Sequence, residues 1–112
     1  DSSGSTLDPA GTALYQRLVR SPGHAAGALG MMANWDLDSL WRDLPRLAVP
    51  LDLVVGERDR TVPPEQATRA MSRLSPALNA QYIQLDGLGH LAHEEQPDTV
   101  ARLIIQRYDA RA

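Results

Sequence analysis

Apolar residues recur along this chain in two rhythms, one typical of helices and the other of short buried strands. Asp8 precedes Pro9 as an N-cap precedes the first residue of a helix, and apolar positions follow until a break at residues 21–23. Residues 24–34 are rich in Ala, Gly and Met, which favours a closely packed helix or the wall of a pocket. A short helical turn is expected to begin near Asp36.

The pattern changes after Pro50, where residues 51–56 form a short apolar run bounded by turn residues, which predicts a buried parallel strand. A second strand is predicted over residues 81–85. A helix that begins at Pro63 and Pro64 is predicted between the two strands, and a final helix is predicted to begin near Pro97. The apolar face of the first of these helices consists of Ala67, Ala70, Met71 and Leu74. That of the second consists of Val100, Leu103, Ile104 and Tyr108.

Strand, helix, strand and helix in this order predict an α/β fold with a right-handed crossover and two parallel strands. The carboxyl ends of parallel strands meet at the same edge of the sheet, so functional groups are expected along that edge.

Composition narrows the functional classes. The 112 residues are 43% hydrophobic, which fits one globular unit, and the net charge of −3 comes without the basic stripe that nucleic acid would need. The absence of cysteine excludes a disulfide framework, thiolate metal sites and a cysteine nucleophile, and suits a reducing cytoplasm. No apolar run approaches the roughly 20 residues of a membrane span, and the polar opening lacks the plan of a signal peptide. We therefore expect a cytoplasmic protein with neither a nucleic-acid partner nor a membrane span.

Two side chains follow the predicted strands directly: Asp59 after the first and His90 after the second. A carboxylate that accepts a hydrogen bond from one imidazole nitrogen fixes the tautomer and leaves the other nitrogen free to take a proton from a hydroxyl. Taken singly, Asp59 could be a turn residue and His90 a loop residue made possible by Gly87 and Gly89. Together they suggest an acid and a general base at one edge of the sheet.

The sequences Gly56-Glu57-Arg58-Asp59 and Gly87-Leu88-Gly89-His90, each after a strand, resemble the last part of α/β-hydrolases, where acid and histidine follow a serine in chain order. The resemblance covers residues 45–108 and implies that Asp59 and His90 belong to a Ser-Asp-His triad. Glu57 competes for the acid role, and the family match alone favours Asp59. No Gly-x-Ser-x-Gly motif occurs, and Ser72 and Ser75 do not lie on a strand-to-helix turn, so the nucleophile is expected upstream and this chain alone is expected to be inactive.

Residues 27–37, Gly-Ala-Leu-Gly-Met-Met-Ala-Asn-Trp-Asp-Leu, resemble the lid segment of hydrolase-like magnesium-chelatase accessory proteins of bacteriochlorophyll synthesis. The alternative is a helix that only packs on the core. The resemblance implies an apolar pocket for a tetrapyrrole or lipid-like ligand. Its expected lining is Met31, Met32, Trp35 and Trp41. The chain is therefore expected to have three segments: a flexible polar N-terminus over residues 1–8, a helical lid over 9–44 and a hydrolase core over 45–112. The N-terminal segment is expected to be a loop or a remnant of cloning.

Two other interpretations of the histidine region are weaker. Residues 87–92 fit a loose Gly-x-Gly-x-x-Ala dinucleotide motif, but no further strand follows to supply the ribose-binding acid. His90, His93 and Glu94 lack the spacing of a zinc site. We therefore expect no cofactor and no metal, and a small-molecule substrate or tetrapyrrole as ligand. The unpaired sheet edge is expected to be covered by a missing upstream part or by self-association.

Overall fold

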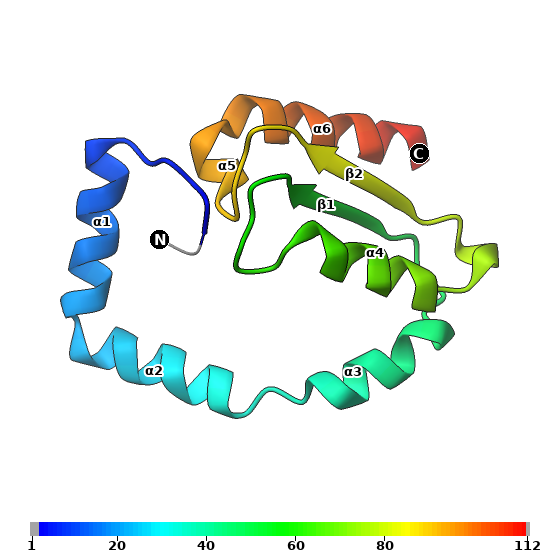
Figure 1. The fold of residues 1–112 in the computed structure, drawn as a ribbon, viewed down its shortest axis with the longest axis horizontal. Coiled ribbons are helices and arrows are strands. Elements are labelled where there is room, and N and C mark those ends of the chain that lie inside the picture. Colours follow the sequence, from blue (N-terminus) through cyan, green and yellow to red (C-terminus); the bar gives the residue numbers. More distant parts are fainter. Residues whose placement is uncertain (1–2, 112) are drawn as a thin grey trace.

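The computed structural model describes residues 3–111, which form an open arc of helices joined to a small α/β unit (Figure 1). The elements are α1 (Pro9–Arg20), α2 (Pro22–Ala33), α3 (Leu37–Asp43), η1 (Leu44–Arg46), β1 (Asp52–Gly56), α4 (Pro64–Arg73), η2 (Pro76–Leu78), β2 (Gln81–Leu85), α5 (Ala92–Glu95) and α6 (Pro97–Arg111). The predicted α/β fold is confirmed, as are both strands and the helices that follow them.

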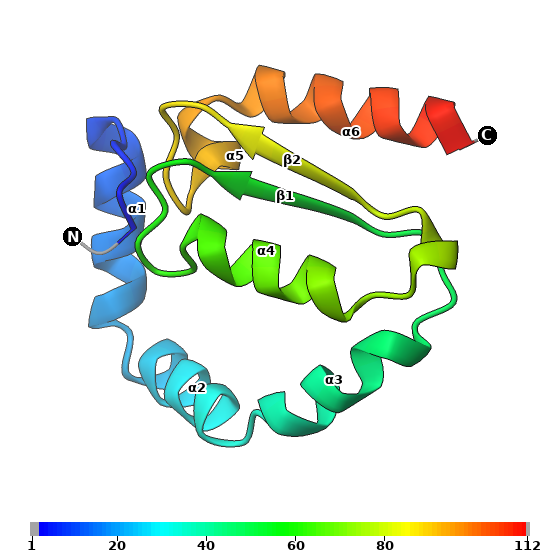
Figure 2. The same cartoon turned by 45° about the vertical axis from the view of Figure 1, so that its right-hand side comes forward.

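β1 and β2 pair in parallel, in a register that runs from Asp52 beside Gln81 to Gly56 beside Leu85. In Figure 2, α4 lies along the β1 side of this pair and α6 along the β2 side. Ion pairs tie α6 to the sheet, because Arg107 and Arg111 reach the carboxylate of Asp52 at 3.1 and 2.6 Å. Because the two strands run parallel, both loops that follow them emerge at the same end of the sheet.

The buried apolar core is small. Among the described residues it consists of Val55, Leu74 and Leu88. The predicted inner face of α4 is correct: Ala67, Ala70 and Met71 are partly buried, and Leu74, which caps the helix, is buried. The predicted face of α6 is wrong in part: Ile104 and Tyr108 are 63% and 75% exposed.

The rotation of α6 explains this difference. The partly buried residues of α6 are Thr99, Val100, Leu103 and Arg107, which lie on one face at intervals of one, three and four. The ion pair of Arg107 with Asp52 keeps that face toward the sheet. Ile104 and Tyr108, each one residue further along, are turned outward.

Side-chain caps define the first three helices. Asp8 accepts from the Gly11 N–H at 2.7 Å, Ser21 from the His24 N–H and Asp36 from the Ser39 N–H. The break predicted at residues 21–23 is real, but Pro22 also starts α2, because a proline is well suited to the first helical position.

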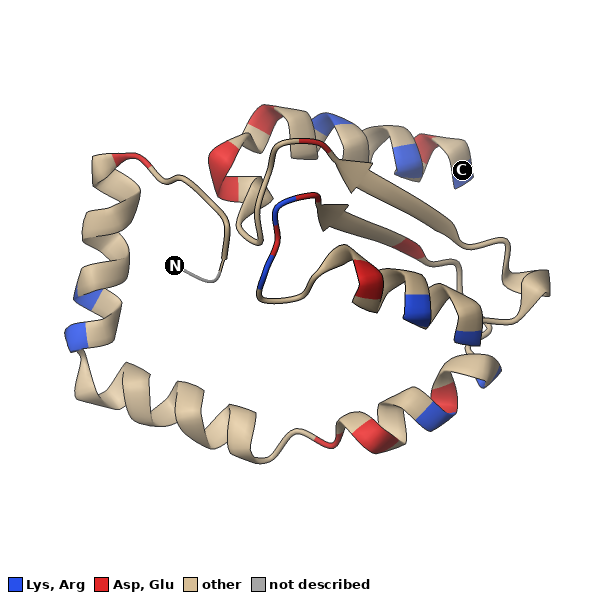
Figure 3. Cartoon of the chain, in the orientation of Figure 1, with Lys and Arg blue, Asp and Glu red and all other residues tan. Residues whose placement is uncertain are grey.

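The helices α1, α2 and α3 form an arc beside the α/β unit (Figures 1 and 2). No charged residue lies on α2, which Figure 3 shows uncoloured from end to end, yet most of its side chains are exposed in this chain. The radius of gyration is 16.2 Å, whereas a compact domain of this length has about 13 Å. The apolar surface of the arc is therefore not buried within the described residues.

Candidate functional site

Asp59 lies in the tight turn that follows β1, and its side chain is 6% exposed. One carboxylate oxygen, Oδ1, accepts hydrogen bonds from the N–H groups of Thr61 and Val62 at 2.9 and 2.8 Å. These bonds compensate for the burial of the carboxylate and fix its orientation. The other oxygen, Oδ2, is left for a different partner.

That partner is His90. Its Nδ1 lies 2.9 Å from Oδ2 of Asp59, while its side chain is 40% exposed. With the proton on Nδ1 the imidazole donates to the carboxylate, and its Nε2 becomes the basic nitrogen. The structure thus brings together the two residues that the sequence analysis singled out, and gives them the geometry of a general base with an orienting acid.

Backbone hydrogen bonds join the loop that carries Asp59, residues 57–63 (the acid loop), to the loop that carries His90, residues 86–91 (the histidine loop). The Arg58 N–H donates to the Leu88 carbonyl at 2.8 Å, and the Glu57 N–H to the Leu85 carbonyl at 3.0 Å. Glu57, the competing candidate for the acid, uses its side-chain Oε1 to accept a hydrogen bond from the backbone N–H of Gly87 at 2.9 Å. Its carboxylate therefore contacts the backbone of the histidine loop and not the imidazole. Gly87 has a φ of +76°, which a residue with a side chain rarely adopts.

The segment Ser3–Thr6 lies across the histidine loop. The His90 N–H donates to the Ser3 carbonyl at 2.7 Å and the Leu91 N–H to Oγ of Ser5 at 2.8 Å. Residues 1 and 2 of the predicted flexible opening lie outside the described residues. The sequence predicts no contact for this segment, because an irregular polar stretch carries no periodic signal of what it packs against.

Glu95 is a site residue to which the sequence alone assigns no contact with the histidine loop. Its Oε1 accepts from the Gly89 N–H at 2.8 Å and its Oε2 from the Thr6 N–H at 3.1 Å. Burial acts to raise the pKa of Glu95, but hydrogen bonds from Gly89, Thr6 and the Ser5 hydroxyl, together with Arg58, lower it below the usual 4.5. The one feature of the sequence that could have pointed to Glu95 is its position five residues after His90, close enough to reach back to the histidine loop.

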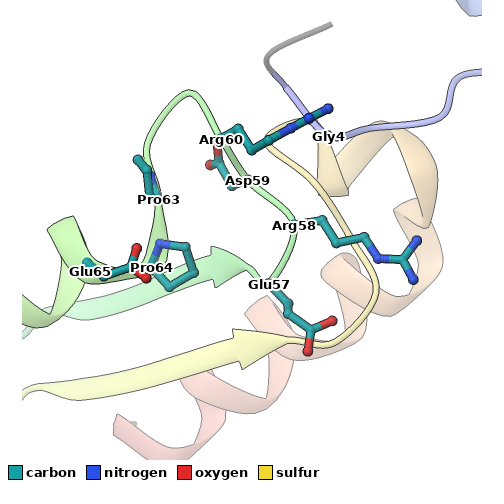
Figure 4. Close-up of a pocket in the computed structure, with 8 residues that line it drawn as sticks. All are labelled: Gly4, Glu57, Arg58, Asp59, Arg60, Pro63, Pro64 and Glu65. Atoms are coloured by element: carbon teal, nitrogen blue, oxygen red, sulfur yellow. The ribbon is translucent and has the colours of Figure 1, made fainter.

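An open cavity of about 610 Å³ adjoins the buried acid. Figure 4 shows Asp59 and Arg60 beside Gly4 on one side of it, with Pro63, Pro64 and Glu65 on the other. Its lining is Gly4, Glu57, Arg58, Asp59, Arg60, Pro63, Pro64 and Glu65. The cavity is therefore bordered by charged groups on the acid loop.

The four residues predicted to line an apolar pocket lie elsewhere. Met31, Met32 and Trp35 are each more than half exposed, at and just beyond the end of α2. Trp41 lies on α3 against α4, with the guanidinium groups of Arg69 and Arg73 at 5.3 and 5.5 Å from its ring. The pocket remains a prediction, and Trp41 has a clear structural contact.

The two serines considered as nucleophiles lie in helical contexts. Ser72 is on α4 and donates to the Arg69 carbonyl, and Ser75 caps η2. Across residues 3–111, no group of three or more His, Asp or Glu side chains is arranged to hold a metal ion. The same part of the chain has no helix that is long and apolar enough to cross a membrane.

Comparison with known proteins shows the family to which the chain belongs. The profile of the alpha/beta hydrolase family matches residues 3–103. The chain is 41% identical over 105 residues to the magnesium-chelatase 30 kDa subunit of Rhodobacter capsulatus, which covers 94% of this chain and 36% of that protein. It is also 36% identical over 63 residues to an epoxide hydrolase of Mycobacterium tuberculosis, which covers 56% of this chain and 29% of that protein. The chain thus spans about a third of the length of these relatives, and it belongs to the alpha/beta hydrolase family.

Proposed function

We propose that Asp59 and His90 are the acid and the histidine of a Ser-Asp-His triad, whose serine is supplied by an upstream part of a longer hydrolase. The observation that carries this proposal is the 2.9 Å contact between Nδ1 of an accessible His90 and a buried Asp59 carboxylate. A purely structural pair gains nothing from an accessible imidazole, whereas a general base requires one.

In the proposed reaction, Nε2 of His90 takes the proton of the serine hydroxyl while the serine oxygen attacks the carbonyl carbon of an ester or amide. Asp59 stabilises the imidazolium that forms. His90 then gives the proton to the leaving alcohol or amine, and the acyl group stays on the serine until water, activated by the same imidazole, releases it. Asp59 begins and ends the cycle as a carboxylate.

A second function has its own support. The relative that aligns with 94% of this chain is named a magnesium-chelatase subunit, which favours a non-catalytic accessory protein on a hydrolase scaffold. In this case the uncharged α2, with Met31, Met32 and Trp35 at its end, would contact a tetrapyrrole. Both functions suit a cytoplasmic protein, which the absence of cysteine supports.

A covalent serine probe tests the catalytic proposal on the protein that carries this chain together with its upstream region. A fluorophosphonate is expected to label the wild type and to lose almost all labelling in the His90→Ala variant. His93→Ala is the matched control, because His93 is an exposed histidine three residues away that does not contact Asp59. Equal labelling in wild type and His90→Ala would rule out the triad.

Tetrapyrrole binding tests the accessory function. Titration with a soluble porphyrin is expected to quench tryptophan fluorescence with saturation if the arc forms the binding surface, and Trp35→Phe should remove most of this signal. Saturable binding without serine labelling would select the accessory function. Labelling without binding would select hydrolysis.

A further inference from the structure

We propose that Glu95 is a positioning residue for His90, which clamps the histidine loop to the segment Ser3–Thr6 through both of its carboxylate oxygens. Oε1 holds the Gly89 N–H at 2.8 Å, directly before the histidine, and Oε2 holds the Thr6 N–H at 3.1 Å. A single side chain thus joins Gly89 to Thr6, which lies 83 positions earlier in the chain.

The clamp matters because three consecutive N–H groups around the histidine depend on it. That of Gly89 is bound by Glu95 itself, that of His90 by the Ser3 carbonyl at 2.7 Å and that of Leu91 by Oγ of Ser5 at 2.8 Å. The last two acceptors belong to the segment that Glu95 fixes at Thr6. The backbone on both sides of the imidazole is therefore immobilised by one network.

Close backbone contact reinforces this arrangement. Gly4 has a φ of +68°, and a Cβ added there would stand 1.8 Å from the Arg58 carbonyl oxygen. A Cβ added at Gly89 would stand 2.5 Å from the Ser3 carbonyl oxygen. The segment therefore touches the acid loop and the histidine loop at once, and displacing it would disturb both members of the pair.

A carboxylate is the side chain that this network requires. Gly89, Thr6 and the Ser5 hydroxyl all donate to Glu95, and an ionised carboxylate is acceptor-only with two oxygens. A glutamine has a single acceptor oxygen and would turn its NH₂ group toward one of the donors. The hydrogen bonds also lower the pKa of Glu95, so the group is ionised at neutral pH.

The adjacent Glu94 is a natural control. It lies on the same short helix and is exposed, but its two oxygens accept from the Tyr15 hydroxyl on α1, at 2.9 Å each. Removing its charge takes one negative charge from the same short helix and leaves the clamp in place. An effect of Glu95 that Glu94 does not share is thus an effect of position.

The proposal rests on the proposed function only in taking His90 as the working base, so its first test measures the Asp59–His90 pair without any reaction. In proton NMR of the protein that carries this chain together with its upstream region, the Nδ1 proton of His90 should give a downfield signal when the carboxylate holds it. Glu95→Gln and Glu95→Ala are expected to broaden this signal and to speed its exchange with water about tenfold or more, as the loss of hydrogen bonds to a charged group implies. Glu94→Gln should leave both unchanged.

The amide signals of β1 and β2 report separately whether the fold survives. If Glu95→Ala does not fold, Ser5→Ala takes its place, because it removes one donor to Glu95 and the acceptor for Leu91 while leaving the carboxylate present. A folded Glu95→Gln or Ser5→Ala variant with the wild-type Nδ1 signal and exchange rate would overturn the clamp, whatever the protein catalyses.

The second test uses the protein that carries the upstream region. Glu95→Gln should lower the rate of serine labelling by about 10- to 100-fold, in the range that a small misplacement of a catalytic group costs. The pH at which labelling is half-maximal should also shift, which a mere loss of folded protein would not cause. A loss of labelling only in proportion to the unfolded fraction, with an unchanged pH profile, would contradict positioning.

Discussion

Gly56 and Gly89 meet backbone to backbone at the end of the sheet, so closely that a Cβ at position 56 would stand 2.3 Å from the Gly89 carbonyl oxygen. Because Gly56 is the last residue of β1 and Gly89 precedes His90, this contact sets the separation of the two loops. Gly56→Ala must push them apart. We expect it to lower the free energy of unfolding by about 1–3 kcal/mol, the usual cost of overpacking, as measured by urea denaturation.

The matched control is Gly27→Ala on α2, where an added Cβ meets nothing within 4 Å. There alanine should stabilise by roughly 0.5–1 kcal/mol, because it lowers the backbone entropy lost on forming a helix. If the unfolding midpoints of both variants moved in the same direction, the argument that a Cβ at position 56 forces the loops apart would be refuted.

Asp59→Asn tests the role of the acid. Asparagine keeps one acceptor oxygen for the Thr61 and Val62 N–H groups, but it presents an NH₂ group to Nδ1 of His90. The imidazole must then take the other tautomer, and serine labelling of the longer protein should fall on the order of 10⁴-fold. Glu57→Gln is the comparison, since its amide oxygen can still accept from Gly87, and labelling within a few-fold of wild type is expected there. Equal losses in the two variants would remove Asp59 from the proposed triad.

Acid should weaken the anchoring of α6. Hydrogen bonds from Arg107 and then Arg111 lower the pKa of Asp52 below its usual 3.8. A carboxylate whose pKa is lower in the folded state stabilises the fold above its unfolded pKa, and this contribution disappears as the pH falls through the folded pKa. The Tm should therefore drop as the pH falls below about 4, and Asp52→Asn should flatten that part of the curve. A variant with the same acid limb as the wild type would show that other carboxylates dominate it.

The elements and the central pair could be predicted from sequence because each depends on local patterns. Alternating turn residues and apolar runs delimit β1 and β2, and a right-handed crossover then requires that Asp59 and His90 emerge at the same end. Their contact follows from topology and short loops. The choice of Asp59 over Glu57 as the acid, however, rested on the resemblance to α/β-hydrolases and not on these local patterns.

The supporting contacts could not be predicted in the same way. Glu95 and Thr6 are 89 positions apart, and no periodic pattern reports a hydrogen bond between an irregular segment and a distant helix turn. Pro22 looked only like a helix breaker because α1 ends directly before it, with Ser21 as the C-cap, although Pro22 is also the first residue of α2. The outward rotation of Ile104 was also hidden, because it depends on an ion pair that Arg107 makes with Asp52.

The last prediction concerns association of the chain on its own. Its two strands pair only with each other among the described residues, its buried apolar core has three members there, and Val54 in the middle of β1 is 46% exposed. Unpaired strand edges with apolar neighbours template pairing with a further strand. We expect sedimentation velocity to show concentration-dependent dimers or larger species, and Val54→Lys to shift the distribution toward monomer, because a charge on an edge strand opposes pairing. Ile104→Lys, an equally charged change on the exposed face of α6 away from the sheet edge, should have a smaller effect. A monomeric wild type at high concentration with a cooperative thermal transition would instead mean that residues 3–111 are stable with this edge open.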